Sequence, residues 1–207
     1  MLVPRLARAE VVAEVGARFQ AMGRVRIEAA FPEAQAAACL TALRGSEHAA
    51  LQRVDPAAGF QIWRFGFVPG VGCEHPLCEL GRWLQGDAVG WVSALTGAPL
   101  GAELDPMLLS DKACKAAFRD GYHARAETVG RAIGYQVHFT PAAWPVEWGG
   151  HLEVLAGPGA EVIERWAPAW NAIDVFELRG DAGWRRLPMI ERHVEGYTIT
   201  GGFHAAS

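Results

Sequence analysis

The chain has 207 residues, of which 51% are apolar and 20% are charged, and its formal net charge is −4. This length fits one domain, 1–207, with a single sizeable core, and the composition is that of an ordinary globular protein. A nucleic-acid partner is not expected, because the sequence contains no basic stripe with interleaved aromatic residues.

The N-terminal stretch, MLVPRLARAEVVAEVGARF, distributes Arg and Glu among its apolar positions, so it does not resemble a secretory signal. No apolar run approaches the roughly 20 residues of a membrane span. The four cysteines form neither CxxC pairs nor a dense scaffold, which predicts reduced thiols. We therefore expect a cytoplasmic protein that does not bind membranes.

The first half of the chain alternates helical and extended patterns. Residues 5–22 have helical periodicity that ends at Gly23, and RVRIEAAF follows as a short strand. Pro32 opens a second helix, PEAQAAACLTALRG, and FQIWRFGF alternates as a strand. Two further helices are expected near 76–85 and 87–96, the first with His75 before Pro76 at its first turn.

From about residue 107 the chain becomes a series of short alternating runs separated by turn residues. The candidate strands are KACKAAF, RAIGYQVHF, HLEVL, AIDVFEL, RRLPMI and GYTITGGF. Strands at this spacing after a helical first half predict a mainly β, α+β protein, a sandwich or jelly roll with helices packed on one sheet. Residues 1–106 would then support a core formed by 107–204.

This order of elements resembles the prolyl-hydroxylase-like branch of the Fe(II)/2-oxoglutarate dioxygenases. The likeness covers nearly the whole chain, and its most specific part is the W…WGG segment of RAIGYQVHFTPAAWPVEWGGHLEVL followed by APAWNAIDVF. Further landmarks are HPLCELGRWL in the helical middle and YTITGGF near the end. The resemblance implies a double-stranded β-helix fold.

The resemblance also implies an iron site, held by His-x-Asp on one strand and by a second His some fifty residues later. This chain departs from that pattern in both possible alignments. Counting back from Arg131, His123 takes the place of the first ligand, but Arg125 stands where the carboxylate should be. Counting forward from FRDG, Glu127 takes that place and Val129 follows.

The other signature positions depart as well. The second histidine of the family falls on Trp184 or Arg185, and the arginine that binds 2-oxoglutarate falls on Glu195 or Gly196. A guanidinium group has no lone pair for a metal, so an arginine cannot replace a histidine ligand. We therefore expect neither Fe(II) nor 2-oxoglutarate as a cofactor.

Other histidines in the sequence are candidates for a metal site or for a structural role. HLE and HVE are both His-x-Glu, and a strand would place each His and Glu on one face, so His151, Glu153, His193 and Glu195 form an alternative metal site. We prefer exposed His/Glu pairs, which are common on strands. His138 shares a face with Gln136 and is expected to be a hydrogen-bonded structural histidine.

The candidate site residues follow from the positions that the iron ligands would have occupied. A phenol, an imidazole and a carboxylate there are candidates for general acid or base: Tyr122, His123 and Glu127. Guanidinium and aromatic side chains near them are candidates for binding substrate or another anion: Arg125, Arg185, Arg186, Tyr135 and Trp148. If these arginines point inward, Glu127, Glu177 or a bound anion must neutralise them.

Three functions remain in order of preference. The first is a metal-independent tailoring enzyme that acts on a carboxylate-bearing small molecule. The second is a true Fe(II)/2-oxoglutarate dioxygenase with relocated ligands, and the third is a non-catalytic homologue that pairs with another protein. A small-molecule substrate is the expected partner, and the sequence leaves open whether the chain also forms a homodimer.

Overall fold

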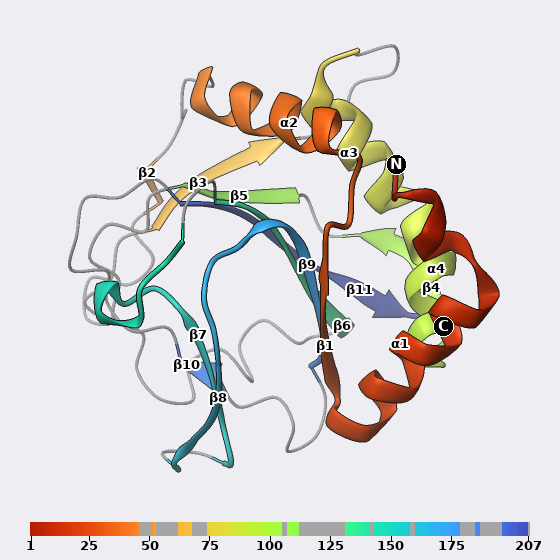
Figure 1. Ribbon diagram of the computed structural model, residues 1–207. Coiled ribbons are helices and arrows are strands. Elements are labelled where there is room, and N and C mark those ends of the chain that lie inside the picture. Colours follow the sequence, from red (N-terminus) through yellow and green to blue (C-terminus); the bar gives the residue numbers. More distant parts are fainter. Residues whose placement is uncertain are drawn as a thin grey trace.

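The computed structural model describes residues 1–45, 51–52, 62–67, 74–104, 107–111, 131–140, 143–157, 160–178, 185–186 and 196–206. In this part of the chain a large curved sheet separates a layer of helices from a smaller sheet (Figure 1). No helix in the described ranges is long and apolar enough to span a membrane.

The helices begin and end close to the predicted positions. The first predicted helix is divided, because Arg8 is extended and separates a 3-10 turn from the α-helix, which ends where Gly23 adopts a left-handed conformation with φ 65°. α3 begins at Pro76 as predicted, and His75 caps it, since its Nδ1 accepts from the Leu77 N–H. The bounds are η1 Pro4–Ala7, α1 Ala9–Met22, α2 Glu33–Gly45, α3 Pro76–Gln85 and α4 Asp87–Thr96.

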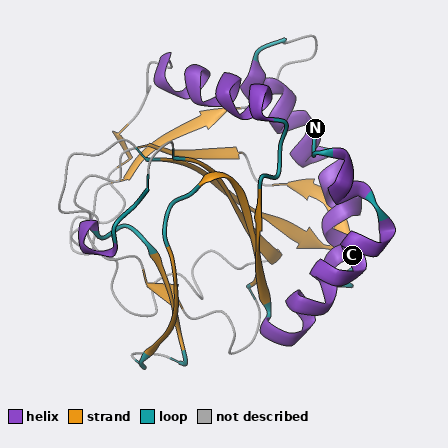
Figure 2. Ribbon diagram, in the orientation of Figure 1, coloured by secondary structure: helices purple, strands orange, loops and turns teal. Residues whose placement is uncertain are grey.

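All strand pairs are antiparallel. The large sheet has the order β1 (Arg24–Glu28), β9 (Trp170–Glu177), β6 (Arg131–Phe139), β11 (Tyr197–Ala205), β5 (Met107–Asp111), β3 (Ile62–Phe67), β2 (Leu51–Gln52), and β4 (Leu100–Leu104) pairs with β11. The small sheet has the order β10 (Arg185–Arg186), β7 (Leu152–Leu155), β8 (Val162–Trp166). This confirms the α+β jelly roll with helices packed on one sheet (Figure 2).

Some strands differ from the prediction. The structure has a strand at Met107–Asp111, and the predicted strand KACKAAF lies outside the described residues. β8 was not predicted, because VIERW carries charged residues on both faces of the strand and so lacks the apolar alternation of a half-buried strand. Of RRLPMI, only Arg185–Arg186 lies among the described residues, and it forms β10.

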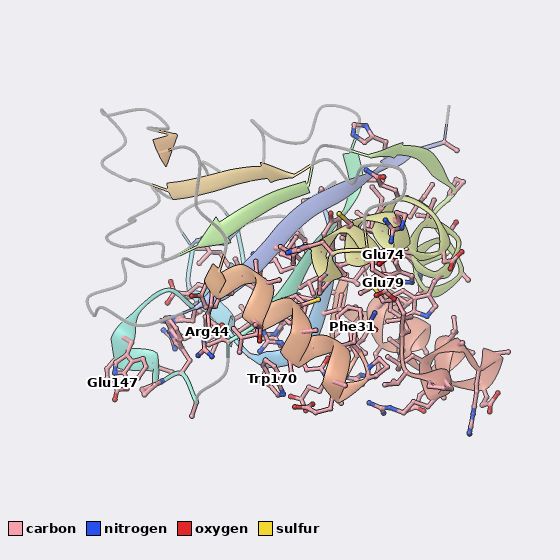
Figure 3. All side chains as sticks on the ribbon, turned by 90° about the horizontal axis from the view of Figure 1, so that it is seen from above. Phe31, Arg44, Glu74, Glu79, Glu147 and Trp170 are labelled. Carbon is pink, nitrogen blue, oxygen red and sulfur yellow. The ribbon has the colours of Figure 1, made fainter. Side chains whose placement is uncertain are left out.

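The core lies between the helices and the large sheet. Alternate residues of four adjacent strands enter it, including Val25, Ile27, Val137 and Ile173, and they pack with helix residues such as Phe19. Phe31, which lies among the helices in Figure 3, contacts Trp83 edge-to-face and stacks on Phe139. Because side chains alternate along a strand, the residues between these core positions must face away from the helices, toward the small sheet.

Two close contacts hold the framework together. Asn171 has a positive φ of 50°, and its side chain makes two hydrogen bonds to Phe31, with Oδ1 accepting from N–H (2.9 Å) and Nδ2 donating to the carbonyl (2.8 Å). On α1, a Cβ at Gly16 would lie 2.7 Å from the carbonyl oxygen of Leu95 on α4. Only glycine lets these two helices approach so closely.

Of the two cysteines that the structure describes, one is the expected free thiol and the other is not. Cys78 on α3 is disulfide-bonded. Cys39 on α2 is free and buried, and burial, with a smaller contribution from Glu79, raises the pKa of its thiol to about 12. Cys39 is therefore a packing residue rather than a reactive thiol.

Candidate functional site

A row of four polar side chains crosses four adjacent strands of the large sheet. Arg26 lies on β1, Asp174 on β9, His138 on β6 and Thr198 on β11, and the register pairs Arg26 with Asp174 and His138 with Thr198. Their neighbours along each strand belong to the helix-side core. The row therefore lies on the opposite face, between the two sheets.

The members of this polar row form a continuous hydrogen-bonded chain. Arg26 donates to both carboxylate oxygens of Asp174, from Nε to Oδ1 and from a terminal nitrogen to Oδ2, each at 2.7 Å. His138 Nε2 lies 2.8 Å from Asp174 Oδ2, and His138 Nδ1 lies 3.1 Å from Thr198 Oγ1. The prediction that His138 is hydrogen-bonded is confirmed on both of its ring nitrogens.

Asp174 is ionised although its side chain is fully buried. Burial alone would raise the pKa of this carboxyl, but the charge of His138 and the hydrogen bonds of Arg26 and His138 outweigh burial and hold the pKa below its ordinary value. An ionised carboxylate accepts hydrogen bonds and cannot donate them. Nε2 of His138 therefore carries a proton in both the neutral and the charged ring. In the neutral ring Nδ1 accepts the hydrogen of the Thr198 hydroxyl, and in the charged ring Nδ1 donates to the hydroxyl oxygen.

Strand β8 of the small sheet lies against the Arg26 end of the polar row. The Arg26 guanidinium lies 5.6 Å from the ring centroid of Trp166. Arg24 donates to Glu164 at 2.5 Å, and the Trp166 indole donates to the other oxygen of Glu164 at 2.6 Å. These contacts join the two sheets beside the site.

A second notable feature surrounds Gly196, one of the two positions where the family resemblance places the arginine for 2-oxoglutarate. A Cβ at Gly196 would lie 2.9 Å from the Trp144 ring. The indole of Trp144 is held by a 2.7 Å hydrogen bond to the Gly149 carbonyl and by edge-on contact with Trp148. No side chain fits at residue 196 unless Trp144 moves, so the site as described does not fit an arginine there.

A buried polar atom without a hydrogen-bond partner lies near Gly196 as well. Thr140 Oγ1 is buried without a hydrogen-bond partner, and it lies 3.6 Å from the Cβ position at Gly196. Trp144 and Trp148 belong to the turn that contains η3 (Val146–Trp148), the short helix that lies apart from the layer of α-helices in Figure 2.

The alternative metal pair is only partly described. His151 and Glu153 share a face, with Nε2 3.2 Å from Oε1, but both side chains are buried, so our preference for an exposed pair was wrong here. Arg165 also donates to Glu153 at 3.1 Å. His193 and Glu195 lie outside the described residues, and within the described ranges no three His, Cys, Asp or Glu residues group as metal ligands.

None of the predicted site residues that the structure describes belongs to the polar row. Tyr122, His123, Arg125 and Glu127 lie outside the described residues. In β10 the register pairs Arg185 with Val154 and Arg186 with Glu153.

The predicted aromatic site residues lie in two other places. Tyr135 lies in the helix-side core, on the opposite face of β6 from His138, and its ring packs against Phe203. Trp148 is half-buried and contacts Trp144. Neither aromatic residue belongs to the polar row.

Three members of the polar row were missed from the sequence: Arg26, Asp174 and Thr198. The signal was present, since each is a polar residue between two apolar ones in VRI, IDV and YTI. Alternation of this kind marks the face away from the core, but it does not show which strands are neighbours.

No protein-family model and no curated protein sequence matches the chain. Solved structures do resemble it. A prolyl-4-hydroxylase from Pseudomonas putida superposes with a TM-score of 0.72 at 15% identity, over 95% of this chain and 100% of that one. A prolyl hydroxylase from Trichoplax adhaerens, in complex with a hypoxia-inducible-factor peptide, gives 0.69 at 13% identity, over 95% and 90%.

A third structural neighbour catalyses a different kind of reaction. The non-heme α-ketoglutarate-dependent epimerase SnoN, from nogalamycin biosynthesis, gives a TM-score of 0.66 at 17% identity, over 96% of this chain and 84% of that one. Identities this low establish the architecture alone. The chain therefore has the fold of the 2-oxoglutarate/Fe(II) oxygenases, in the form found in the prolyl hydroxylases.

Proposed function

We propose that the protein is a metal-independent enzyme of this fold that acts on a carboxylate-bearing small molecule held between the two sheets. The observation that carries the proposal is the packing of Trp144 against Gly196, which leaves no room for the arginine that the resemblance would place there. Without that guanidinium group, 2-oxoglutarate loses a bidentate charge-assisted contact.

The sequence also supports the loss of the iron site. Neither alignment gives His-x-Asp near residues 123–129, and Trp184 or Arg185 stands in place of the second histidine. A cationic guanidinium group repels a divalent metal and attracts an anion instead. Arg125 and Arg185 are therefore the residues proposed to bind the substrate carboxylate, with His123, Glu127 or Tyr122 as general acid or base.

The comparison with SnoN shows that this fold is compatible with a small-molecule substrate. SnoN is an epimerase of nogalamycin biosynthesis, so the same fold serves in small-molecule biosynthesis as well as in prolyl hydroxylation. The fold alone does not fix the substrate. The proposal for this chain therefore depends on its own arginines.

The test compares Arg125→Ala and Arg185→Ala with the wild type for thermal stabilisation by small carboxylates and by sulfate. Arg18→Ala, on the exposed side of α1, is the matched control. The wild type and the control should melt at higher temperature as the anion concentration rises, because ligand binding stabilises the folded state by mass action. An unresponsive wild type, or a full response in both variants, would remove the anion site from the proposal.

The second candidate, an Fe(II)/2-oxoglutarate dioxygenase with relocated ligands, is favoured by the buried His151–Glu153 pair. His151 Nδ1 has no hydrogen-bond partner, so the ring retains a coordinating atom. Arg165 weakens this candidate, because it already neutralises Glu153. Iron at near-stoichiometric occupancy in purified protein, lost in His151→Ala, would favour the second candidate over the first.

A further inference from the structure

The hydrogen-bonded chain of Arg26, Asp174, His138 and Thr198 has a buried middle and two more accessible ends. Asp174 and His138 are 0% and 3% exposed, whereas the Arg26 side chain is 19% exposed and Thr198 is half-buried. Trp166 covers the guanidinium at the first end. The Thr198 hydroxyl is therefore the point at which a small molecule between the sheets would meet the chain.

We infer that Thr198 and His138 form a proton-coupled carboxylate site, in which the Thr198 hydroxyl donates to a bound carboxylate while His138 takes up one proton. The carboxylate class of the ligand rests on the proposed function. The coupling itself rests on the geometry of the polar row. It assigns a role to a histidine that was expected to be purely structural.

When the His138 ring is neutral, the direction of the hydrogen bonds opposes anion binding. The Asp174 carboxylate requires a proton on His138 Nε2, so the neutral ring presents a lone pair at Nδ1. In this neutral form the Thr198 hydroxyl, 3.1 Å from Nδ1, would satisfy that lone pair by donating its single hydrogen inward. Only oxygen lone pairs of Thr198 then face outward, and a carboxylate would be repelled by them.

Protonation of His138 reverses this direction. With a proton on Nδ1, the ring donates to Thr198 Oγ1, and the hydroxyl hydrogen becomes available to an outside acceptor. The charges favour the same exchange, because Arg26 and Asp174 already cancel and an imidazolium adds one buried positive charge. A bound carboxylate neutralises that charge, so the proton and the anion stabilise each other.

Among the residues that the structure describes, the other charged groups on this face do not remove the coupling. Arg24 and Glu164 are paired with each other across the two sheets. Both lie next to Arg26, on the side of Arg26 away from His138. Glu28 lies at the exposed end of β1. The charged partner in direct contact with the His138 ring is Asp174, and Asp174 shares its charge with Arg26.

The experiment uses the full chain and three small carboxylates, benzoate, phenylacetate and succinate. Calorimetric titration in two buffers of different ionisation enthalpy measures the protons taken up with the ligand. Uptake of up to one proton per bound carboxylate is expected for the wild type. The dissociation constant should then rise by up to about tenfold per pH unit, since linkage ties this slope to the number of protons bound.

Variants test whether His138 is the residue that takes up the proton on ligand binding. His138→Gln keeps a donor toward Asp174 but cannot take up the proton, so uptake should fall to zero. Thr198→Val removes the hydroxyl at similar volume and should weaken binding at least tenfold. Thr41→Val, at an exposed helix position whose hydroxyl donates to the Ala37 carbonyl, is the matched control and should behave as the wild type.

The ring nitrogens of His138 give a readout in the unmutated protein. On addition of the carboxylate that binds, the ¹⁵N signal of Nδ1 should move from that of an acceptor to that of a protonated nitrogen. Binding without proton uptake, or uptake that persists in His138→Gln, would overturn the coupling and leave the carboxylate class intact. If none of the three carboxylates binds, the proposed function falls together with the site.

Discussion

Asp174→Asn is the substitution that most directly tests the polar row as part of the fold. The wild-type carboxylate accepts two hydrogen bonds from Arg26 and one from His138, all at 2.7 or 2.8 Å. An asparagine of similar size offers one acceptor oxygen, and its amide group places N–H bonds opposite donors of Arg26 or His138. At least one buried donor is then left without a partner.

The size of the effect follows from burial. Removing one partner of a buried ion pair costs about 3–5 kcal/mol, and the lower end applies because Arg26 remains 19% exposed and the amide oxygen keeps one hydrogen bond. A loss of about 3 kcal/mol lowers the melting temperature of a chain of this length by about 6–12 °C. Glu164→Gln is the control, because Glu164 is 33% exposed and its pair with Arg24 is worth about 1 kcal/mol or less.

The pH dependence of the free energy of unfolding provides a second test of the same prediction. Because the folded-state pKa of Asp174 is lowered, the stability that the carboxylate contributes is fully present above its ordinary pKa of about 3.9 and is lost as the pH falls toward the folded-state pKa. The melting curves of wild type and Asp174→Asn, followed by circular dichroism, should therefore converge as the pH falls below about 4. A variant within about 1 kcal/mol of the wild type at neutral pH would refute the reasoning.

Three further substitutions test the framework by thermal or urea unfolding. Gly16→Val should destabilise the protein by about 1–3 kcal/mol, because the new Cβ would lie 2.7 Å from the Leu95 carbonyl oxygen. Gly90→Val is the control and should cost less than about 1 kcal/mol, because a Cβ at Gly90 meets no atom within 4 Å. Asn171→Ala should cost about 2 kcal/mol or more, since it removes two buried hydrogen bonds and keeps the positive φ. Gly196→Ala should destabilise through its contact with Trp144, and Trp144→Phe in the same chain should restore part of the loss.

Much of the architecture could be predicted from local patterns. His75 before Pro76 marks the start of α3, and Gly23 marks the end of α1, because each residue has a conformational role that does not depend on distant contacts. The alternation in RAIGYQVHF correctly separated His138 from Tyr135 and Val137, which the structure places in the core. These features depend on residues a few positions apart.

The candidate site could not be predicted in the same way. Arg26 and Asp174 are 148 residues apart, and His138 and Thr198 are 60 apart, so their meeting depends on the order and register of four strands. A shift of one residue in any strand would turn its polar member into the core. The packing of Trp144 over Gly196 likewise depends on the turn around η3, for which the sequence gives composition but no geometry.

The most direct test of the central claim is a calorimetric titration of 2-oxoglutarate into the protein in the presence of Mn(II), repeated anaerobically with Fe(II). Loss of both metal chelation and the bidentate arginine contact removes several kcal/mol, or roughly a thousandfold in affinity. The account predicts no binding in the micromolar range with either metal. Micromolar affinity for 2-oxoglutarate that depends on the metal would contradict it and would favour the dioxygenase with relocated ligands.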